Sequence, residues 1–207
     1  MTDKFLGIRA RRPASLGGSF FFAALLGVLT VFFSCVSAPG REGCSTELLA
    51  PGTKSPERLV SFFKSHGGKD AERAGRLAEY YVEEARIEGI NSDVAFVQMC
   101  LETGFLGFGN LVVPEMNNFC GLGAMDPEHP GEWFESERIG VRAHIQHLQA
   151  YATTEDVSLR QELVDPRYSW PHKAKLARSV HDLAGSWATD PEYGEKLDRL
   201  LRELSGF

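Results

Sequence analysis

Glu102 is an acidic residue in an apolar setting. It lies in the stretch QMCLETGF, residues 98–105, and follows a mostly apolar run from Val94 to Leu101 that leaves almost no polar face for a helix. A helix that is apolar all round is usually buried. Glu102 is therefore either a helix end that reaches water, because Gly104 stops the helix within a turn, or a carboxyl in a poorly solvated place. A carboxyl of the second kind has a raised pKa and can hold and transfer a proton near neutral pH.

Helices must position this carboxyl, and the spacing of apolar residues predicts six of them. Their expected ranges are about 55–66, 70–88, 92–103, 137–153, 171–188 and 191–205. Trp187 is expected to pack in the core. Residues 104–131 form a long, Gly-rich segment, and a loop of this length is usually functional or disordered; its aromatic content argues against disorder. No run of alternating strands appears, so the fold class is all-α, with at most a short hairpin between Ala124 and Phe134.

The N-terminal segment has the pattern of an export signal. Arg9, Arg11 and Arg12 precede the apolar run from Ser19 to Phe33, which is the order of the basic and apolar regions in such signals. The run is short for a membrane span, which needs about 20 apolar residues; an uncleaved anchor starting near Ala14 is the alternative. The mature protein is therefore expected outside the cytoplasm, in the periplasm or cell envelope.

Cys35 directly follows the apolar run, at the position where bacterial lipoproteins carry the cysteine that takes a lipid. The small residues from Val36 to Ala38 offer ordinary signal cleavage as the alternative. We favour lipidation of Cys35 and hence a membrane anchor. The expected organisation is an export signal over residues 1–34, a flexible tether over 35–54 that is rich in Ser, Pro and Gly, and one monomeric domain over 55–207.

Charge and residue spacing argue against two kinds of function. The chain has 22 Lys and Arg against 28 Asp and Glu, and the acidic excess grows when residues 1–34 are removed, so nucleic acid is not an expected partner. His144 and His147 lie three apart on a predicted helix, but no further ligands accompany them, so we expect no metal and no other cofactor. Cys100 and Cys120 are expected to be buried free thiols, with a disulfide between them as the alternative.

Two motifs occur in the order found in one enzyme family. The stretch VQMCLETG, which ends at Gly104, and the stretch NNFCGLGA, residues 117–124, resemble the bacterial glucosaminidases of the autolysin and flagellar-muramidase type. The stretches GVRAHIQHLQAYA, VDPRYSW and LAGSWATDPEYGEKL continue the resemblance and are characteristic of a short bacterial branch. The similarity runs from about Ser55 to the C-terminus.

The resemblance implies a lysozyme-like α-helical fold that hydrolyses the β-1,4 bond after N-acetylglucosamine in the glycan strands of peptidoglycan. Glu102 matches the catalytic glutamate of the family and would be the general acid. Asn117, Asn118 and Phe119 match the loop that lines the glycan cleft, and Tyr193 matches a tyrosine that the family places near the glutamate. Turn formation by the two asparagines and core packing by Phe119 are the structural alternatives.

A second carboxylate is where the sequence departs from the family pattern. Longer members carry another glutamate in a hairpin, but here only the segment MDPEHPGEWFES precedes the next predicted helix. Its acids are Asp126, Glu128, Glu132 and Glu135, and each is more often a solvated loop charge than a functional group. Glu132 and Glu128 rank first among them. Alternatively, the N-acetyl group of the substrate acts as the nucleophile in place of a second carboxylate.

The leading interpretation is an exported N-acetylglucosaminidase with a lipid anchor. Two alternatives have the same cleft: a glycan-binding or anchoring protein without activity, and a lytic transglycosylase that uses a lone glutamate. Glu102 favours an enzyme over a binding protein, because a protein that only binds glycan has no need for an ionisable group in an apolar setting.

Overall fold

The computed structural model describes residues 43–207, and this part of the chain has the all-α fold that the sequence predicts. Its helices are α1 (Pro56–Ser65), α2 (Ala71–Glu88), α3 (Ser92–Thr103), α4 (Glu137–Ala152) and α5 (Tyr193–Leu204), and its short 3-10 turns are η1 (Pro114–Met116), η2 (Pro171–Lys173) and η3 (Val180–Leu183). Residues 43–207 contain no strand, only isolated bridges such as that between Asp126 and His129. Among these residues no helix combines the length and the apolar character that a membrane crossing requires.

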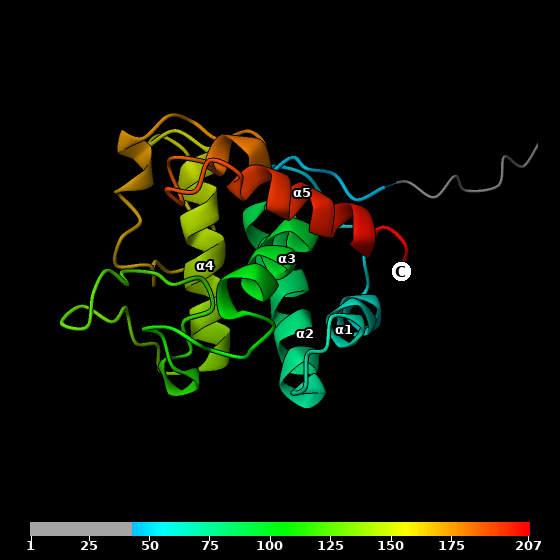
Figure 1. The fold of residues 1–207 in the computed structure, drawn as a ribbon. Coiled ribbons are helices and arrows are strands. Elements are labelled where there is room, and N and C mark those ends of the chain that lie inside the picture. Colours follow the sequence, from blue (N-terminus) through cyan, green and yellow to red (C-terminus); the bar gives the residue numbers. More distant parts are fainter. Residues whose placement is uncertain (1–42) are drawn as a thin grey trace, which may run out of the picture. The chain divides into compact units, whose positions relative to one another are not determined.

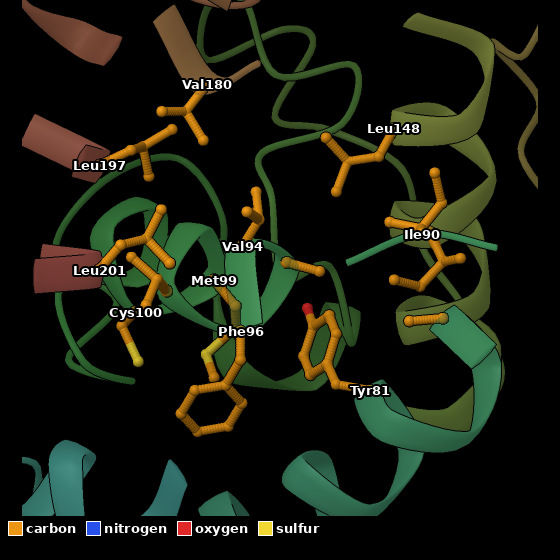
Figure 2. Packing of buried hydrophobic residues seen from close by; sticks show 14 of the residues in the cluster. Tyr81, Ile90, Val94, Phe96, Met99, Cys100, Leu148, Val180, Leu197 and Leu201 are labelled. Atoms are coloured by element: carbon orange, nitrogen blue, oxygen red, sulfur yellow. The ribbon is translucent and has the colours of Figure 1, made fainter. Parts of the chain in front are cut away.

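Helix α3 lies at the centre of the domain, and α2, α4 and α5 pack around it (Figure 1). Ten of its twelve residues are buried. Figure 2 shows Val94 and Phe96 of α3 in one apolar cluster with Tyr81 of α2, Leu148 of α4 and Leu201 of α5. This enclosure explains the apolar run in the sequence, because a helix covered on all sides has no face left for polar residues.

Local signals in the sequence fix both ends of α3. The side chain of Asn91 caps the N-terminus and accepts hydrogen bonds from the backbone N–H groups of Asp93 (3.0 Å) and Val94 (3.4 Å). Gly104 ends the helix in the left-handed conformation, with φ of 57°, which glycine adopts without a steric penalty. The helix therefore ends at Thr103, the residue after Glu102, and places this carboxyl at the end of a buried element.

The helix expected over residues 171–188 is wrong. The segment forms the short turns η2 and η3, and residues 178–180, at the start of η3, bond to the N-terminal part of the domain. The N–H of Val180 donates to the C=O of Thr46 (2.9 Å), and the C=O of Arg178 accepts from the N–H of Leu48 (2.9 Å). These tertiary hydrogen bonds replace helical ones, so the local spacing of apolar residues does not decide the structure here.

The expected flexible tether is wrong for residues 43–54. Leu48 is fully buried in the core. The side-chain amide of Asn91 donates to the C=O groups of Ser45 and Glu47 (both 3.1 Å). This polar segment belongs to the domain because its backbone groups find hydrogen-bond partners there and one of its two leucines, Leu48, is buried.

Residues 1–42 lie outside the described part of the chain. The expected export signal, the cleavage site and the lipidation site at Cys35 all fall in this range. The boundary expected after residue 34 therefore stays a prediction.

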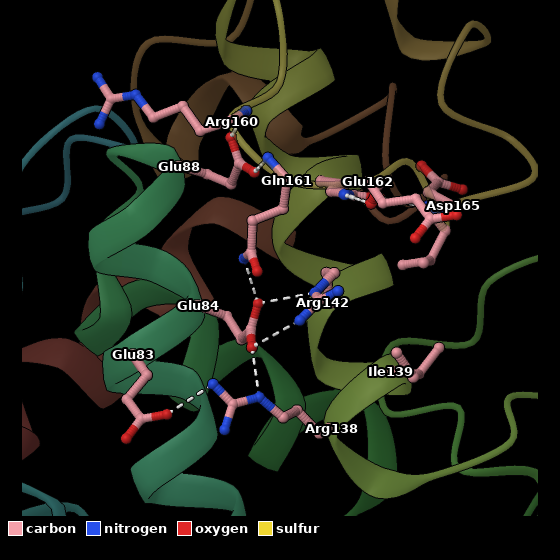
Figure 3. A network of polar contacts seen from close by, with 12 residues as sticks. Glu83, Glu84, Glu88, Arg138, Ile139, Arg142, Arg160, Gln161, Glu162 and Asp165 are labelled. Carbon is pink, nitrogen blue, oxygen red and sulfur yellow. Dashed lines mark hydrogen bonds and ion pairs between the residues drawn. The ribbon is translucent and has the colours of Figure 1, made fainter.

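A buried ionic network joins α2 to α4 and to the segment that follows α4 (Figure 3). The side chain of Glu84 has no exposed surface. Its carboxylate accepts hydrogen bonds from Nε of Arg138 (2.7 Å), from Nε of Arg142 (2.9 Å) and from the Gln161 amide. Burial alone raises the pKa of Glu84, but the bonds from Arg142, Gln161 and Arg138 outweigh it, so the pKa lies below its usual value. Glu84 therefore stays charged and connects three segments.

Candidate active site

Glu102 lies half-buried in the last turn of α3, where two side chains hold its carboxyl. The indole Nε1–H of Trp187 donates to Oε1 of Glu102 (3.0 Å), and the hydroxyl of Tyr193 donates to the same oxygen. Among residues 43–207 no group forms a hydrogen bond to Oε2. The carboxyl is thus oriented through one oxygen, which leaves the other oxygen for a ligand.

The pKa of Glu102 is raised above its usual value. Burial is the largest cause, because it disfavours the charged form. The hydrogen bonds from Tyr193 and Trp187 act in the opposite direction, since they stabilise the carboxylate, but they do not cancel the effect of burial. Because both donors occupy Oε1, a proton on this carboxyl is carried by Oε2. Glu102 is therefore a carboxyl in a poorly solvated place and not a frayed helix end.

A chain of buried polar side chains continues from Tyr193 into the core. The Nε2 group of Gln98 donates to the Tyr193 hydroxyl (2.8 Å), and Oε1 of Gln98 bonds to Nε2 of His144 (3.1 Å). The other ring nitrogen of His144 bonds to the hydroxyl of Tyr81 (2.8 Å). The side-chain oxygen of Gln98 can only accept, so His144 carries its proton on Nε2. In this series of hydrogen bonds, each donor therefore points toward Glu102.

We expect the domain to lose stability as the pH falls from 6.5 to 5. Burial, with a smaller effect of nearby His147, lowers the pKa of His144 from 6.5 to about 3. Between these values the unfolded chain binds a proton that the folded domain does not bind, so the free energy of unfolding falls with the pH. The loss at pH 5 is about 2 kcal/mol, at about 1.4 kcal/mol for each pH unit.

Urea unfolding at pH 7 and at pH 5 measures this loss. The variant His144→Gln has no titratable group at this position, so its stability should depend less on pH by the same amount. An equal pH dependence in the variant and the wild type would contradict the assignment to His144.

Glu102 borders a cavity of about 290 Å³. Residues 108–112 of the long loop between α3 and α4 line it, as do Gly121 of the same loop and Trp187 from the segment before α5. Glu102 is the one carboxylate among the lining residues of the described chain. The long loop therefore forms a large part of the wall of the site.

Of the three loop residues expected at the cleft, Asn118 borders the cavity and Asn117 and Phe119 do not. The amide of Asn118 is used within the loop, because its Nδ2 donates to the C=O groups of Leu122 (2.8 Å) and Glu132 (3.1 Å). Asn117 turns the chain with φ of 50°. Phe119 is fully buried in the core, which is the packing alternative. A side chain without exposed surface offers no platform for a sugar, so Phe119 is a core residue and not a substrate contact.

Neither acid ranked as a second carboxylate borders the cavity around Glu102. Glu128 is exposed, and its backbone N–H donates to Oδ1 of Asp126 (3.0 Å) within a tight turn. The carboxyl of Glu132 lies against Gly123. A Cβ atom at position 123 would be only 2.9 Å from Oε1 of Glu132. In the described chain the cavity therefore contains one acid and not a pair.

Trp187 is a site residue, contrary to the expectation that it only packs in the core. Besides its bond to Glu102, its indole packs against the rings of His147 and Tyr151, with centroids 5.3 and 5.4 Å away. The sequence contained a signal for this role, because Trp187 lies six residues before Tyr193 in one continuous matched stretch. Both residues reach the same oxygen.

The residues considered for metal binding or a disulfide have other roles. His144 belongs to the polar chain described above, and Nδ1 of His147 bonds to Oδ2 of the buried Asp165 (2.7 Å). Cys100 and Cys120 are buried free thiols, which confirms that expectation. Residues 43–207 contain no group of three or more His, Cys, Asp or Glu side chains placed to hold a metal ion.

Comparisons with known proteins agree with this geometry. The glucosaminidase family model, described as mannosyl-glycoprotein endo-beta-N-acetylglucosaminidase, matches residues 78–206. A protein of Borreliella burgdorferi (strain ATCC 35210 / DSM 4680 / CIP 102532 / B31), described as an uncharacterized protein, is 37% identical over 158 residues, which is 76% of this chain and 76% of that protein. No solved structure matches the chain. The region matched by the family contains both Glu102 and Tyr193, so the chain belongs to the glucosaminidase family and is a glycoside hydrolase of the N-acetylglucosaminidase kind.

Proposed function

We propose that the protein is an endo-β-N-acetylglucosaminidase that cleaves the β-1,4 bond after N-acetylglucosamine in peptidoglycan, with Glu102 as the general acid. The observation that carries the proposal is how the Glu102 carboxyl is hydrogen-bonded. Oε1 is held by Tyr193 and Trp187, and Oε2 has no protein partner at the edge of the cavity. Burial raises the pKa of this group, which favours the protonated form that donates a proton to a leaving oxygen.

Cleavage begins when the Oε2 proton passes to the glycosidic oxygen and the bond from C1 to that oxygen breaks. The lone carboxylate at the cavity supports the N-acetyl group of the substrate as the nucleophile, whose carbonyl oxygen bonds to C1 as the leaving sugar departs. Water then attacks C1, the bond from C1 to the acetamide oxygen breaks, and Glu102 takes back a proton from this water.

Digestion of purified peptidoglycan by the full-length chain, with mass spectrometry of the products, tests the proposal. Hydrolysis at the proposed bond leaves N-acetylglucosamine at each new reducing end. Anhydro sugars would instead identify a lytic transglycosylase, for which the lone carboxylate also provides support. Binding of glycan without new ends would identify a glycan-binding or anchoring protein.

The proposal also places the mature protein in the cell envelope, held to a membrane by a lipid on Cys35. Its support is the basic segment, the apolar run and the cysteine directly after that run. A fatty-acid probe fed to the cells is expected to label the wild type and the variant Cys44→Ala but not Cys35→Ala. Equal labelling of all three proteins, or labelling of none, would remove the lipid anchor from the proposal.

A further inference from the structure

We propose that Arg167 forms a second subsite, which binds a carboxylate carried by the muramyl sugar next to the cleaved N-acetylglucosamine. This inference rests on the proposed function and adds a specificity that the family assignment does not contain. It is carried by a second cavity, by the charge at its edge and by the alternation of sugars along the glycan.

The second cavity adjoins the first. It measures about 170 Å³ and shares Cys120, Gly121, Ala124 and Trp187 with the cavity around Glu102. Because the two cavities share these walls, they lie side by side. In the proposed subsite, the sugar next to the one at Glu102 lies at the second cavity.

Arg167 is the one arginine or lysine that lines either cavity. Within residues 43–207 no carboxylate lies within ion-pair distance of its guanidinium. The nearby Asp165 accepts from His147 through Oδ2 and from the backbone N–H of Arg167 through Oδ1 (2.8 Å), so its two oxygens already have partners. The charge of Arg167 is therefore available to a ligand.

Stacking holds the guanidinium in place. It lies over the ring of Trp170 at 3.9 Å from the ring centre, and Trp170 itself is 58% exposed. A stacked guanidinium loses less freedom on binding than a free one, and its planar fork of donors matches the two oxygens of a carboxylate. By contrast, Arg73, Arg76, Arg138, Arg142 and Arg202 form ion pairs with acids of the domain.

The chemistry of the glycan supplies the carboxylate. N-acetylglucosamine carries no charge, but the muramyl sugar carries a lactyl group that ends in a free carboxylate or in a peptide with carboxylates of its own. Because the two sugars alternate, both neighbours of the cleaved N-acetylglucosamine are muramyl sugars, whichever side the second cavity is on. The chain has a net charge of −6, so a cation placed at the cavity offsets the repulsion of this anionic neighbour.

Calorimetric titration of the full-length chain carrying Glu102→Gln measures binding without turnover. The probes are three soluble tetrasaccharides: a neutral oligomer of N-acetylglucosamine, a muramyl glycan with free lactyl carboxylates, and the same glycan with its peptides. Adding Arg167→Gln is expected to lower the ratio of affinities for a carboxylate probe over the neutral probe about fivefold, the scale of an exposed ion pair. The muramyl probe that loses affinity identifies the source of the carboxylate.

The matched control is Arg178→Gln, which removes the same charge from an exposed arginine that lines neither cavity. It should leave the affinity ratio at its starting value. The variant Arg167→Lys keeps the positive charge but lacks the planar set of N–H donors of a guanidinium, so it should lower the ratio by less than Arg167→Gln. An unchanged ratio in Arg167→Gln, or the same loss in Arg178→Gln, would overturn the subsite while leaving the proposed function intact. Failure of all three probes to bind would overturn both.

Discussion

The variant Glu102→Gln is expected to cleave glycan at about one hundredth of the wild-type rate or less, on the scale of general acid catalysis. The amide oxygen of glutamine can still accept from Tyr193 and Trp187, so the local structure persists. The amide nitrogen then takes the place of Oε2 and cannot give a proton to a leaving oxygen. Because the substitution replaces a partly buried ionisable group by a neutral one, the melting temperature should be unchanged or higher.

Release of reducing ends from peptidoglycan measures the rate, and thermal unfolding measures the stability. Glu128→Gln and Glu132→Gln are matched controls, since they make the same chemical change at acids outside the cavity. Both are expected to cleave near the wild-type rate. Cleavage retained in Glu102→Gln would refute the mechanism, and a loss in Glu132→Gln as large as that in Glu102→Gln would restore the second carboxylate.

Replacing Glu84 by alanine is expected to lower the free energy of unfolding by about 3 kcal/mol. The carboxylate is fully buried, and its removal leaves Arg138 and Arg142 without their shared partner. The value is at the lower end for a broken buried pair, because both arginine side chains keep some exposed surface through which water can reach them. The loss also frees the Gln161 amide, so the segment after α4 should become more open to hydrogen exchange.

Glu83→Ala provides the control for Glu84→Ala. Glu83 is the adjacent residue and also pairs with Arg138 (2.7 Å), but its side chain is 53% exposed. Exposed ion pairs contribute little, so this variant should lose less than about 1 kcal/mol. Urea unfolding of the two variants separates the cases, and equal losses would mean that burial of the network does not matter.

The sequence predicts the central part of the site because several signals there agree. The apolar run, the cap at Asn91 and the stop at Gly104 all predict α3 with Glu102 in its last turn, and the structure has α3 at Ser92–Thr103. The resemblance predicts Tyr193 beside the glutamate, and its hydroxyl bonds to that carboxyl. In such places local preference and tertiary packing require the same conformation.

The segment before α5 shows where sequence reasoning fails. Residues 171–188 have the apolar spacing of a helix, yet their backbone bonds to residues 46–48 instead, and no pattern within the segment contains that partner. The polar chain through Gln98 and His144 is hidden for a similar reason. Its residues come from different helices, and only the packing of those helices brings their side chains within 3.1 Å.

The roles of the loop residues depend on backbone geometry that spacing does not encode. The motif places Asn118 at the cavity, but whether its amide faces a sugar or the loop depends on the turn from Cys120 to Leu122. In the structure this turn forms hydrogen bonds with both ends of the Asn118 amide: Oδ1 accepts from the N–H of Leu122 (2.9 Å), and Nδ2 donates to the C=O of Leu122 (2.8 Å). Asn118 therefore holds the shape of the loop at the edge of the cavity.

The packing of residues 43–54 into the domain shortens any tether that would join the domain to a lipid on Cys35. A tether from Cys35 to Ser55 would span up to about 72 Å when fully extended, whereas the chain from Cys35 to Gly43 spans at most about 29 Å. With the proposed lipid on Cys35, the domain begins no farther than this shorter distance from the bilayer surface. The glycan within its range is then limited to strands that lie within this distance plus the length of the domain itself.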